Sequence, residues 1–302
     1  MDSLTLRRES QTCTTVTMRT DFAVFIMVWG RPGQMWTAKT LRNQGYTGKI
    51  FYVGDDLDPS IEDYRKKYGD DLLVFSKTEV MGRYDSGDNS GDLRSTMYAV
   101  NVIPELAKER GIKYFFIFCD DYTRFVYKFD SELVYTDKKI LNLDGVFEAM
   151  LDYYLKTNAL SIAMSQTGDF IGGKNSGMAK ELRLKRKAMN SFLCSTDRPF
   201  EFVGRMNEDV STYVHLGHRG GLFFTLPNVC LQQRPTQAEG GGLTEMYLDY
   251  GTYVKSFFSV MYNPSSVKVS EMGQVYKRIH HKVNWNNAVP KILSEDWRQI
   301  GQ

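Results

Sequence analysis

Short apolar runs alternate with amphipathic stretches through the first part of the chain. The runs are stopped by glycine, proline or acidic residues, and they cover 22–29, 49–53, 72–75 and 114–118. Continuous apolar runs of this length are typical of strands buried on both faces, as in parallel sheets. Helices are predicted between them over 34–43 and 94–110, and another is predicted to begin near Asp58. The alternation predicts right-handed β-α-β crossovers and an open, nucleotide-fold-like sheet, whose ligands gather at the carboxyl ends of the strands.

The pattern is less regular after residue 140. It predicts further elements, namely a helix over 141–155, a strand over 160–165, a glycine-bearing loop over 168–177, a helix over 207–218 and a strand over 221–226. Neither an internal repeat nor a linker interrupts the chain. The fold class expected is therefore α/β, with a mainly parallel, mixed sheet flanked by helices in a single elaborated domain over 21–302. Residues 1–20 are expected to form a mobile polar tail.

Composition narrows the class of protein. The formal net charge is +2, so no bulk attraction to nucleic acid or to an anionic membrane follows from it. The four cysteines are scattered without a C-x-x-C pair, so neither a zinc knuckle nor a disulfide framework is indicated, and a reducing compartment fits. The longest apolar run is too short for a membrane span, and no secretory signal is recognised. We expect a cytoplasmic protein with no membrane partner, and the sequence leaves its oligomeric state open.

Acidic residues stand at the strand ends where phosphate-binding folds more usually have glycines. Asp55 and Asp56 follow the second predicted strand, Asp120 and Asp121 follow the fourth, and neither dinucleotide nor P-loop glycine motifs occur. Carboxylates just past a buried strand are costly to desolvate unless a positive group meets them, and a divalent cation is one candidate. Successive strand side chains diverge, so Asp120 and Asp121 are not expected to bind one ion equally. The alternative is a polar strand end with aspartate as a turn former.

Acids and histidines in the second half form two more candidate sites. Asn207 is a candidate N-cap, and Glu208 and Asp209 then occupy the first helical turn, where the helix dipole favours anions. That position explains both acids by itself, and it also suits a general base held above the sheet. The pair His280 and His281 is a source of at most one metal ligand, because neighbouring strand side chains diverge. The alternative is a surface or core pair without a ligand role.

Five basic residues gather in the segment over 180–187, namely Lys180, Arg183, Lys185, Arg186 and Lys187. Such a cluster suits contact with a phosphate backbone. A solvated helix face explains the same residues equally well.

In their order, these motifs resemble the GT-A class of nucleotide-sugar glycosyltransferases. More narrowly, they resemble the phage DNA glycosyltransferases found alongside TET-like oxygenases that act on 5-hydroxymethylcytosine. The motifs are Gly30-Arg31-Pro32, Asp55-Asp56, Asp120-Asp121-Tyr122, Asn207-Glu208-Asp209 and Arg278-Ile279-His280-His281. The resemblance covers roughly 22–293, and it implies a nucleotide-sugar-binding half over 21–125 and an acceptor-binding half over 126–302.

The resemblance also implies roles for single residues. Asp121 matches the last acid of the GT-A D-x-D motif, which binds the Mn²⁺ or Mg²⁺ ion bridging the donor diphosphate, while Cys119 replaces the first acid. Asp209 matches the catalytic base, with Glu208 beside it, and His281 or His280 matches a late metal ligand. The residues implied to bind the donor, a UDP-sugar, are Arg31, Asp55, Asp56, Arg94 and Asp120.

The implied function is transfer of a hexose from a UDP-sugar to 5-hydroxymethylcytosine in phage DNA, in the cytoplasm of the host cell. Contact with DNA is expected from Lys180, Arg183, Lys185, Arg186 and Lys187 and from the loop over 168–177. Two alternatives stay open. One is a GT-A enzyme with a glycan, lipid or protein acceptor, which the low net charge favours. The other is a nucleotide- or DNA-binding module without turnover. The presence of Cys119 in place of the first acid of the GT-A motif favours this alternative.

Overall fold

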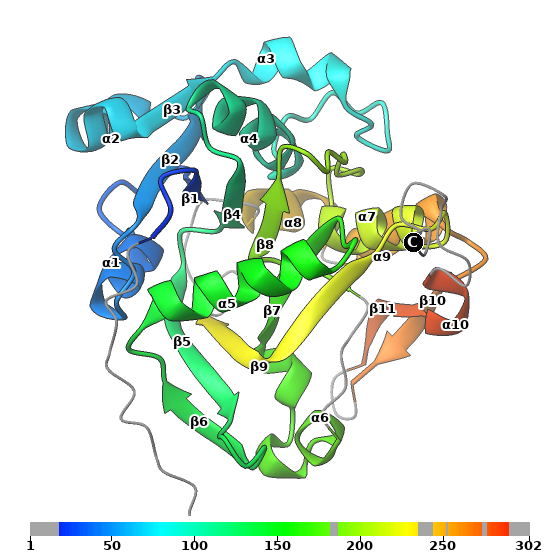
Figure 1. The fold of residues 1–302 in the computed structure, drawn as a ribbon. Helices are drawn as coiled ribbons and strands as arrows, with labels where there is room; N and C mark the ends of the chain where they lie inside the picture. Colours follow the sequence, from blue (N-terminus) through cyan, green and yellow to red (C-terminus); the bar gives the residue numbers. More distant parts are fainter. Residues whose placement is uncertain (1–17, 182–186, 235–243, 252, 274–276, 290–302) are drawn as a thin grey trace, which may run out of the picture.

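The fold is built on a mixed β-sheet with helices on both faces (Figure 1). The computed structural model describes residues 18–181, 187–234, 244–251, 253–273 and 277–289. Within these residues, nine strands form the main sheet in the order β3-β2-β1-β4-β8-β7-β9-β5-β6. The strands are β1 (Phe22–Met27), β2 (Lys49–Asp55), β3 (Leu72–Phe75), β4 (Tyr114–Phe118), β5 (Tyr122–Phe129), β6 (Tyr135–Lys139), β7 (Ser161–Gln166), β8 (Phe192–Ser195) and β9 (Phe223–Gln233).

Helices connect these strands, and a separate hairpin lies beyond them in the chain. The helices are α1 (Trp36–Asn43), α2 (Ile61–Tyr68), α3 (Lys77–Val80), α4 (Met97–Glu109), α5 (Leu143–Lys156), α6 (Gly177–Lys180), α7 (Glu208–Gly217), α8 (Thr244–Tyr250), α9 (Val254–Tyr262) and α10 (Trp285–Ala288). The hairpin consists of β10 (Val267–Met272) and β11 (Arg278–Val283), which form a two-stranded sheet of their own.

The four strands predicted in the first part of the chain are confirmed as β1 to β4. Strand β1 pairs in parallel with β2 and with β4, and β2 pairs in parallel with β3. Because these four strands run the same way, their carboxyl ends meet at one edge of the sheet. The other half is mixed, with β4 antiparallel to β8, β5 antiparallel to β9, and β7 parallel to β9. The expected α/β class with a mixed sheet is therefore confirmed.

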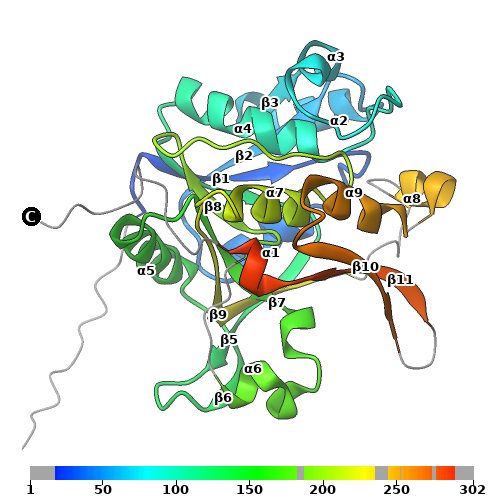
Figure 2. The same ribbon diagram turned by 90° about the vertical axis from the view of Figure 1, so that its right-hand side faces the viewer.

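Alternate side chains of β1 enter two hydrophobic clusters, one on each face of the sheet. Phe22, Val24 and Ile26 lie in the cluster that α1, α2 and α5 cover, whereas Ala23 and Phe25 lie in the cluster that α4 and α7 cover. Figure 2 shows α4 and α5 on opposite sides of the sheet. Burial of one such large side chain stabilises the fold by about 1.5 to 3 kcal/mol. Burial on both faces leaves no position for a polar side chain, which is why the run is continuous.

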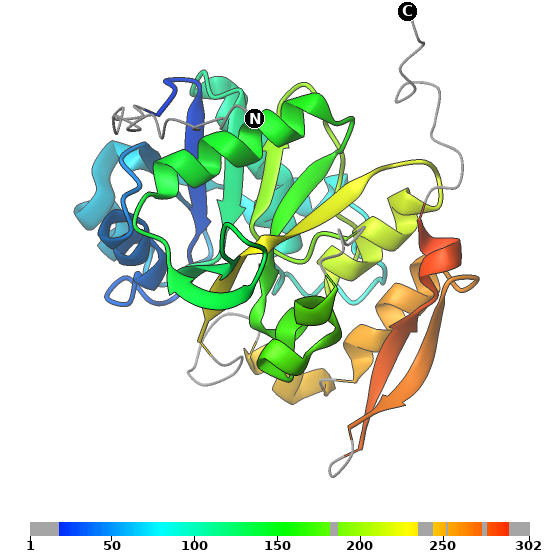
Figure 3. The same cartoon turned by 60° about the horizontal axis from the view of Figure 1, so that its bottom comes forward.

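The structure also contains elements that the pattern did not predict. Strand β5 follows β4 after a tight turn, and the predicted loop over 168–177 holds short 3₁₀ turns and the start of α6. The hairpin of β10 and β11 packs on α9 and projects from the body of the molecule (Figure 3). Met18 packs in the core, although the pattern placed it in the polar tail; residues 1–17 lie outside the described part of the chain.

None of the helices described in the structure is long and apolar enough to cross a bilayer.

Gln44 ties the end of α1 to the antiparallel half of the sheet. Its buried side-chain amide donates to the carbonyl oxygens of Phe125 and Ile140, at 2.8 and 2.7 Å, and its Oε1 accepts from the amide of Phe125 at 3.0 Å. Three hydrogen bonds from one side chain therefore join segments about 80 and 95 residues apart in the chain.

We expect Gln44→Leu to lower the free energy of unfolding by about 1 to 3 kcal/mol, because it leaves the buried amide of Phe125 without its acceptor. Urea unfolding measures the change. Asn43→Leu, on the exposed side of the same helix, is the matched control. Equal stability of the two variants would show that these hydrogen bonds contribute no net stability.

Candidate active site

A tight turn carries Asp120 and Asp121 from the end of β4 into β5. The Asp120 side chain is only 6% exposed, and its Oδ1 accepts a hydrogen bond from the guanidinium of Arg31 at 2.8 Å. Arg31 follows β1, which is the parallel neighbour of β4. The ion pair therefore joins two adjacent strands at their carboxyl ends, where ligands bind in open α/β sheets.

The hydroxyl of Thr37, near the start of α1, fixes the shape of this turn. It donates to the carbonyl oxygen of Cys119 at 2.6 Å and accepts from the amide of Tyr122 at 2.8 Å. The amide of Thr37 also donates to the carbonyl oxygen of Asp120 at 3.1 Å. The backbone on both sides of Asp121 is thus held by one residue of a neighbouring helix.

The carboxylate of Asp121 is the chemically open group of the turn. Its Oδ1 is buried and has no hydrogen-bond partner within the described residues. Burial raises the pKa of this carboxyl, and the charges of Arg31 and Arg234 oppose the rise. A buried carboxylate oxygen with this environment suits a hard divalent cation, which takes oxygen ligands.

A second pair of acids stands at the start of α7. The hydroxyl of Thr96 donates to the carboxylate of Glu208, and Asp209 Oδ1 accepts from the amide of Val210 at 2.7 Å. Burial raises the pKa of both carboxyls, and the neighbouring charge of Glu208 raises that of Asp209 further. Asn207 does not cap the helix through its side chain as expected, because its backbone is left-handed, with φ of +57°.

Both acidic segments influence the pKa of one thiol, that of Cys119. The thiol of Cys119, at the end of β4, lies within electrostatic reach of Asp121 and Asp120 on one side and of Glu208 on the other. Burial raises its pKa, and all three carboxylates raise it further. The charges of the β4–β5 turn and of the start of α7 therefore act on the same thiol.

Asp55 and Asp56 lie at the end of β2 and are both bound to Lys77. The carboxylate of Asp55 meets the Lys77 ammonium at 2.7 Å, with only 7% and 6% of the two side chains exposed. Asp56 accepts from the amide of Lys77 at 2.9 Å, and the ammonium lies 4.4 Å from the ring centroid of Trp29. Both acids thus fasten the start of α3 to the sheet, and their contact with a donor stays a prediction.

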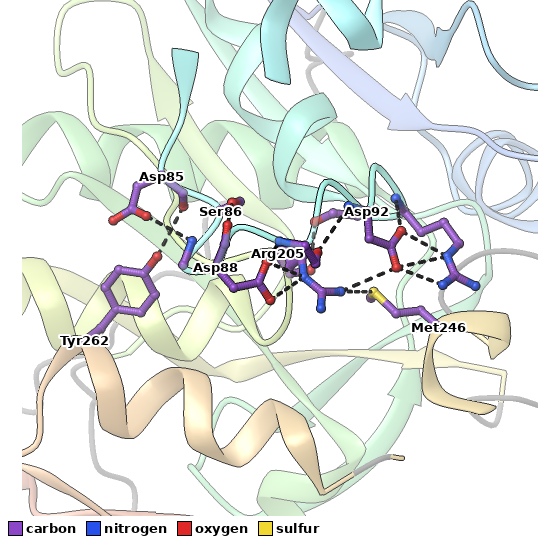
Figure 4. Close-up of polar contacts among 11 residues, drawn as sticks. Asp85, Ser86, Asp88, Asp92, Arg205, Met246 and Tyr262 are labelled. Carbon is purple, nitrogen blue, oxygen red and sulfur yellow. Dashed lines mark hydrogen bonds and ion pairs between the residues drawn. The ribbon is translucent and has the colours of Figure 1, made fainter. Parts of the chain in front are cut away.

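Arg205 fastens the segment before α4 to the segment before α7 (Figure 4). Its guanidinium binds Asp88 at 2.8 Å and Asp92 at 3.7 Å, and it meets the sulfur of Met246 at 3.2 Å. Arg94 binds Asp92 as well, at 2.8 Å. This network holds the residues before Thr96 beside those before Glu208, so it positions the acids of α7.

Arg94 also forms an ion pair at 2.6 Å with Asp249 of α8. The resemblance to GT-A enzymes implies that Arg94 binds the donor. Within the described residues its guanidinium instead joins two carboxylates of the protein, which raise its pKa. Its role toward a donor stays a prediction.

The role of the two histidines as metal ligands beside Asp121 stays a prediction. His280 and His281 lie on β11 of the separate hairpin, whereas Asp121 lies at the edge of the main sheet. Among the described residues no group of three or more histidine, cysteine, aspartate or glutamate side chains could hold a metal ion. Burial lowers the pKa of His281 to about 4, and its Nδ1 has no hydrogen-bond partner in that part of the chain.

The predicted basic segment is described only at its two ends. Lys180 is exposed at the end of α6. Lys187 forms an ion pair with Asp169 at 2.9 Å, and little of either side chain is exposed. Arg183, Lys185 and Arg186 lie outside the described residues. The part of the segment that the structure describes thus includes one cation already bound within the protein.

Comparison with known proteins identifies the family to which the chain belongs. The model of the TET-Associated Glycosyltransferase family matches residues 22–242, well over half of the chain. The chain therefore belongs to this family and is a glycosyltransferase, as the order of its motifs suggested. No curated protein matches the sequence.

Several solved structures are similar at low identity. A mannosyltransferase from Pyrobaculum calidifontis, in complex with GDP-Man and Mn²⁺, is 12% identical with a TM-score of 0.43, covering 85% of this chain and 78% of that one. Glucosyl-3-phosphoglycerate synthase from Mycobacterium tuberculosis, in complex with Mn²⁺, uridine diphosphate and phosphoglyceric acid, is 9% identical with a TM-score of 0.42, covering 87% and 86%.

Sequence reasoning missed the residues that hold the site in place. Thr37 and Thr96 belong to no motif, and Arg205 stands just before the acids of α7 without a role assigned to it. The hydrogen-bond partners of Thr37, Thr96 and Arg205 at Cys119, Glu208 and Asp88 lie 82 to 117 residues away in the chain. A lone threonine or arginine carries no local signal of such a contact. The acids, by contrast, were found because they follow a buried strand or begin a helix.

We expect Thr37→Val to lower the free energy of unfolding by about 1 to 3 kcal/mol, since it leaves the buried amide of Tyr122 unsatisfied. The same change should slow sugar transfer by loosening the turn that carries Asp121. Chemical denaturation and initial rates measure the two effects. Thr37→Ser keeps the hydroxyl and should retain both properties; equal loss in the two variants would contradict this role for the hydroxyl.

Proposed function

We propose that the protein transfers a hexose from a UDP-linked nucleotide sugar to the hydroxymethyl group of 5-hydroxymethylcytosine in phage DNA. The observation that carries the proposal is the buried carboxylate oxygen of Asp121, which has no hydrogen-bond partner in the described residues and lies in the turn at the carboxyl end of parallel strand β4. Membership of the TET-associated glycosyltransferases supports this acceptor, because the family name links the enzyme to TET. Nucleotide-sugar transfer needs one acid for a metal and one for a proton, and this site offers both.

On the donor side, Asp121 is proposed to hold Mn²⁺ or Mg²⁺. Its buried Oδ1, without a hydrogen-bond partner in the described residues, fits such an ion. Mg²⁺ commonly takes one or two carboxylates and completes its shell with substrate phosphates, so a site without three protein ligands is adequate. When bound, the ion neutralises negative charge on the departing diphosphate. Arg31, paired with Asp120 beside the same turn, adds a fixed positive charge.

On the acceptor side, Asp209 is proposed as the general base. The acceptor hydroxyl oxygen forms a bond to the anomeric carbon while the bond from that carbon to the diphosphate oxygen breaks. The bonding pair leaves with the nucleoside diphosphate, and the hydroxyl proton passes to Asp209. The raised pKa of Asp209 makes it a stronger base than an ordinary aspartate. A base on the acceptor side suits inversion at the anomeric carbon.

The acceptor base must become accessible before it can react. In a duplex, the hydroxymethyl group must be reached in a groove or the base must be extruded, which costs a few kcal/mol of unstacking. Lys180 and the loop over 168–177 are proposed to contact this DNA, together with the predicted segment that ends at Lys187. The ion pair of Lys187 with Asp169 gives it a structural role as well.

We expect Asp121→Asn and Asp209→Asn each to lower the transfer rate at least about 100-fold, since each removes a charge used in the reaction. The assay incubates protein with Mn²⁺, a panel of nucleotide sugars and DNA with or without 5-hydroxymethylcytosine, then measures the mass of the digested nucleosides. A hexose-sized gain confined to modified DNA is the expected result.

The matched control for both variants is Asp152→Asn, on the exposed side of α5, which should keep full activity. Undiminished turnover after either site substitution removes that residue from its role. Release of the nucleoside diphosphate without modified DNA points to another acceptor, such as a glycan, lipid or protein. No release with any donor favours a binding module.

The pH profile tests the environment of Asp209. Only the deprotonated base accepts a proton, so a raised pKa places the acidic limb of the rate profile above the ordinary aspartate value of 3.8. Glu208→Gln removes a neighbouring negative charge, so the pKa of Asp209 falls and the limb should move to lower pH. Exposed Glu132→Gln should leave the limb in place. An acidic limb that stays at the same pH or moves to higher pH in Glu208→Gln would contradict the electrostatic coupling between Glu208 and Asp209.

A further inference from the structure

The hairpin of β10 and β11 is a narrow two-stranded ribbon attached to the body at its base. Val267, its first residue, is almost fully buried in the core cluster beneath α4 and α7, and both strands pack on α9. The ribbon then extends away from the main sheet (Figures 2 and 3). Its far part therefore presents its side chains to solvent, beyond the family-matched residues 22–242.

The strand register separates the ribbon into two faces. Residues directly opposite in an antiparallel pair share a face, and successive residues alternate between faces. Val267 pairs with Val283, and since Val267 is buried, the face it belongs to turns toward the body at the base of the ribbon. The other face carries three cross-strand pairs: Lys268 with Lys282, Ser270 with His280, and Met272 with Arg278.

Positive charge is concentrated on this second face. Lys268, Arg278 and Lys282 are exposed, and none of them forms an ion pair with another described residue. The ribbon's acid, Glu271, lies on the first face and is bound to Lys277 at 2.9 Å. Two lysines directly opposite one another repel, so their pairing does not serve the stability of the hairpin itself. Their arrangement suits an anionic partner.

We propose that the face of the β10–β11 ribbon bearing Lys268, Arg278 and Lys282 grips the phosphate backbone of duplex DNA. A two-stranded β-ribbon has the width to enter a major groove, and the three cations follow one side of it, as a run of phosphates requires. The proposal rests on the proposed DNA acceptor, and it assigns the grip to a surface outside the predicted basic segment.

The ribbon stands beside the acceptor side of the proposed reaction. Helix α9, on which it packs, carries Lys255, whose ammonium lies within electrostatic reach of both Arg278 and Asp209. A duplex held on the ribbon is therefore anchored next to the start of α7. The contacts are to phosphates, so the grip is independent of base sequence and sensitive to salt.

The test compares a triple variant, Lys268→Ala with Arg278→Ala and Lys282→Ala, with the wild-type chain. Binding of a short fluorescent duplex is followed by anisotropy over about 50 to 200 mM salt. We expect the Kd to rise about tenfold or more at the low-salt end. The slope of log K against log salt should become shallower by about 2 to 3, or about 0.9 for each phosphate that the protein no longer neutralises.

The matched control removes three exposed cations elsewhere, with Lys108→Ala, Lys138→Ala and Lys139→Ala. It carries the same change in net charge and should bind DNA nearly as the wild type does. Thermal melting checks that both variants fold. If the triple variant does not fold, Lys268→Ala and Lys282→Ala are tested singly, each with an expected slope change of about 0.9.

The outcomes test DNA binding by the ribbon independently of the proposed sugar transfer. Equal affinity and slope in the triple variant and the control overturn the ribbon assignment, whether or not DNA is glycosylated. Loss of duplex binding in the triple variant alone supports the ribbon, even if the wild-type chain transfers no sugar to DNA. If transfer occurs, the triple variant should show a raised KM for the duplex and an unchanged kcat.

Discussion

The ion pair between Arg31 and Asp120 is the interaction on which the arrangement of the site depends. It joins the residues that follow β1 and β4, two strands whose ends are adjacent because they pair in parallel. An almost fully buried carboxylate is costly unless a positive group compensates it, so the guanidinium is required wherever this turn exists. The next residue, Asp121, has a buried carboxylate oxygen without a hydrogen-bond partner in the described residues.

A second constraint fixes the start of α7, where Glu208 and Asp209 lie. The helix follows a segment that Arg205 ties to Asp88 and Asp92 in the loop before α4. The same loop leads to Thr96, whose hydroxyl holds Glu208. Residues more than 100 positions apart thus set the place of one helix start. Burial and the nearby charge of Glu208 both raise the pKa of Asp209, and this rise is what makes an aspartate useful as a base near neutral pH.

The sequence predicted those parts of the structure that leave a pattern in neighbouring residues. Strands β1 to β4 were predicted because burial on both faces leaves an unbroken apolar run, whereas β5 and β10 carry exposed polar residues and leave none. The acids at 120–121 and 208–209 were found because strand ends and helix starts can be located from local pattern. The contacts of Thr37 and Arg205 were not found, because only the completed fold brings their partners near. The histidines were grouped with Asp121 by motif order, yet they lie on a separate hairpin.

The charge distribution explains how a chain with a net charge of only +2 can serve a polyanionic acceptor. Carboxylates gather where the reaction needs a cation and a base, and this same site repels the phosphates of DNA. Cations placed among these acids form internal pairs, as Lys77, Arg94 and Lys187 do, and lose their attraction for a partner. Attraction to a phosphate backbone must therefore come from cations held away from the acids. The β10–β11 ribbon supplies such cations, because Lys268, Arg278 and Lys282 are exposed and none of them forms an ion pair with another described residue.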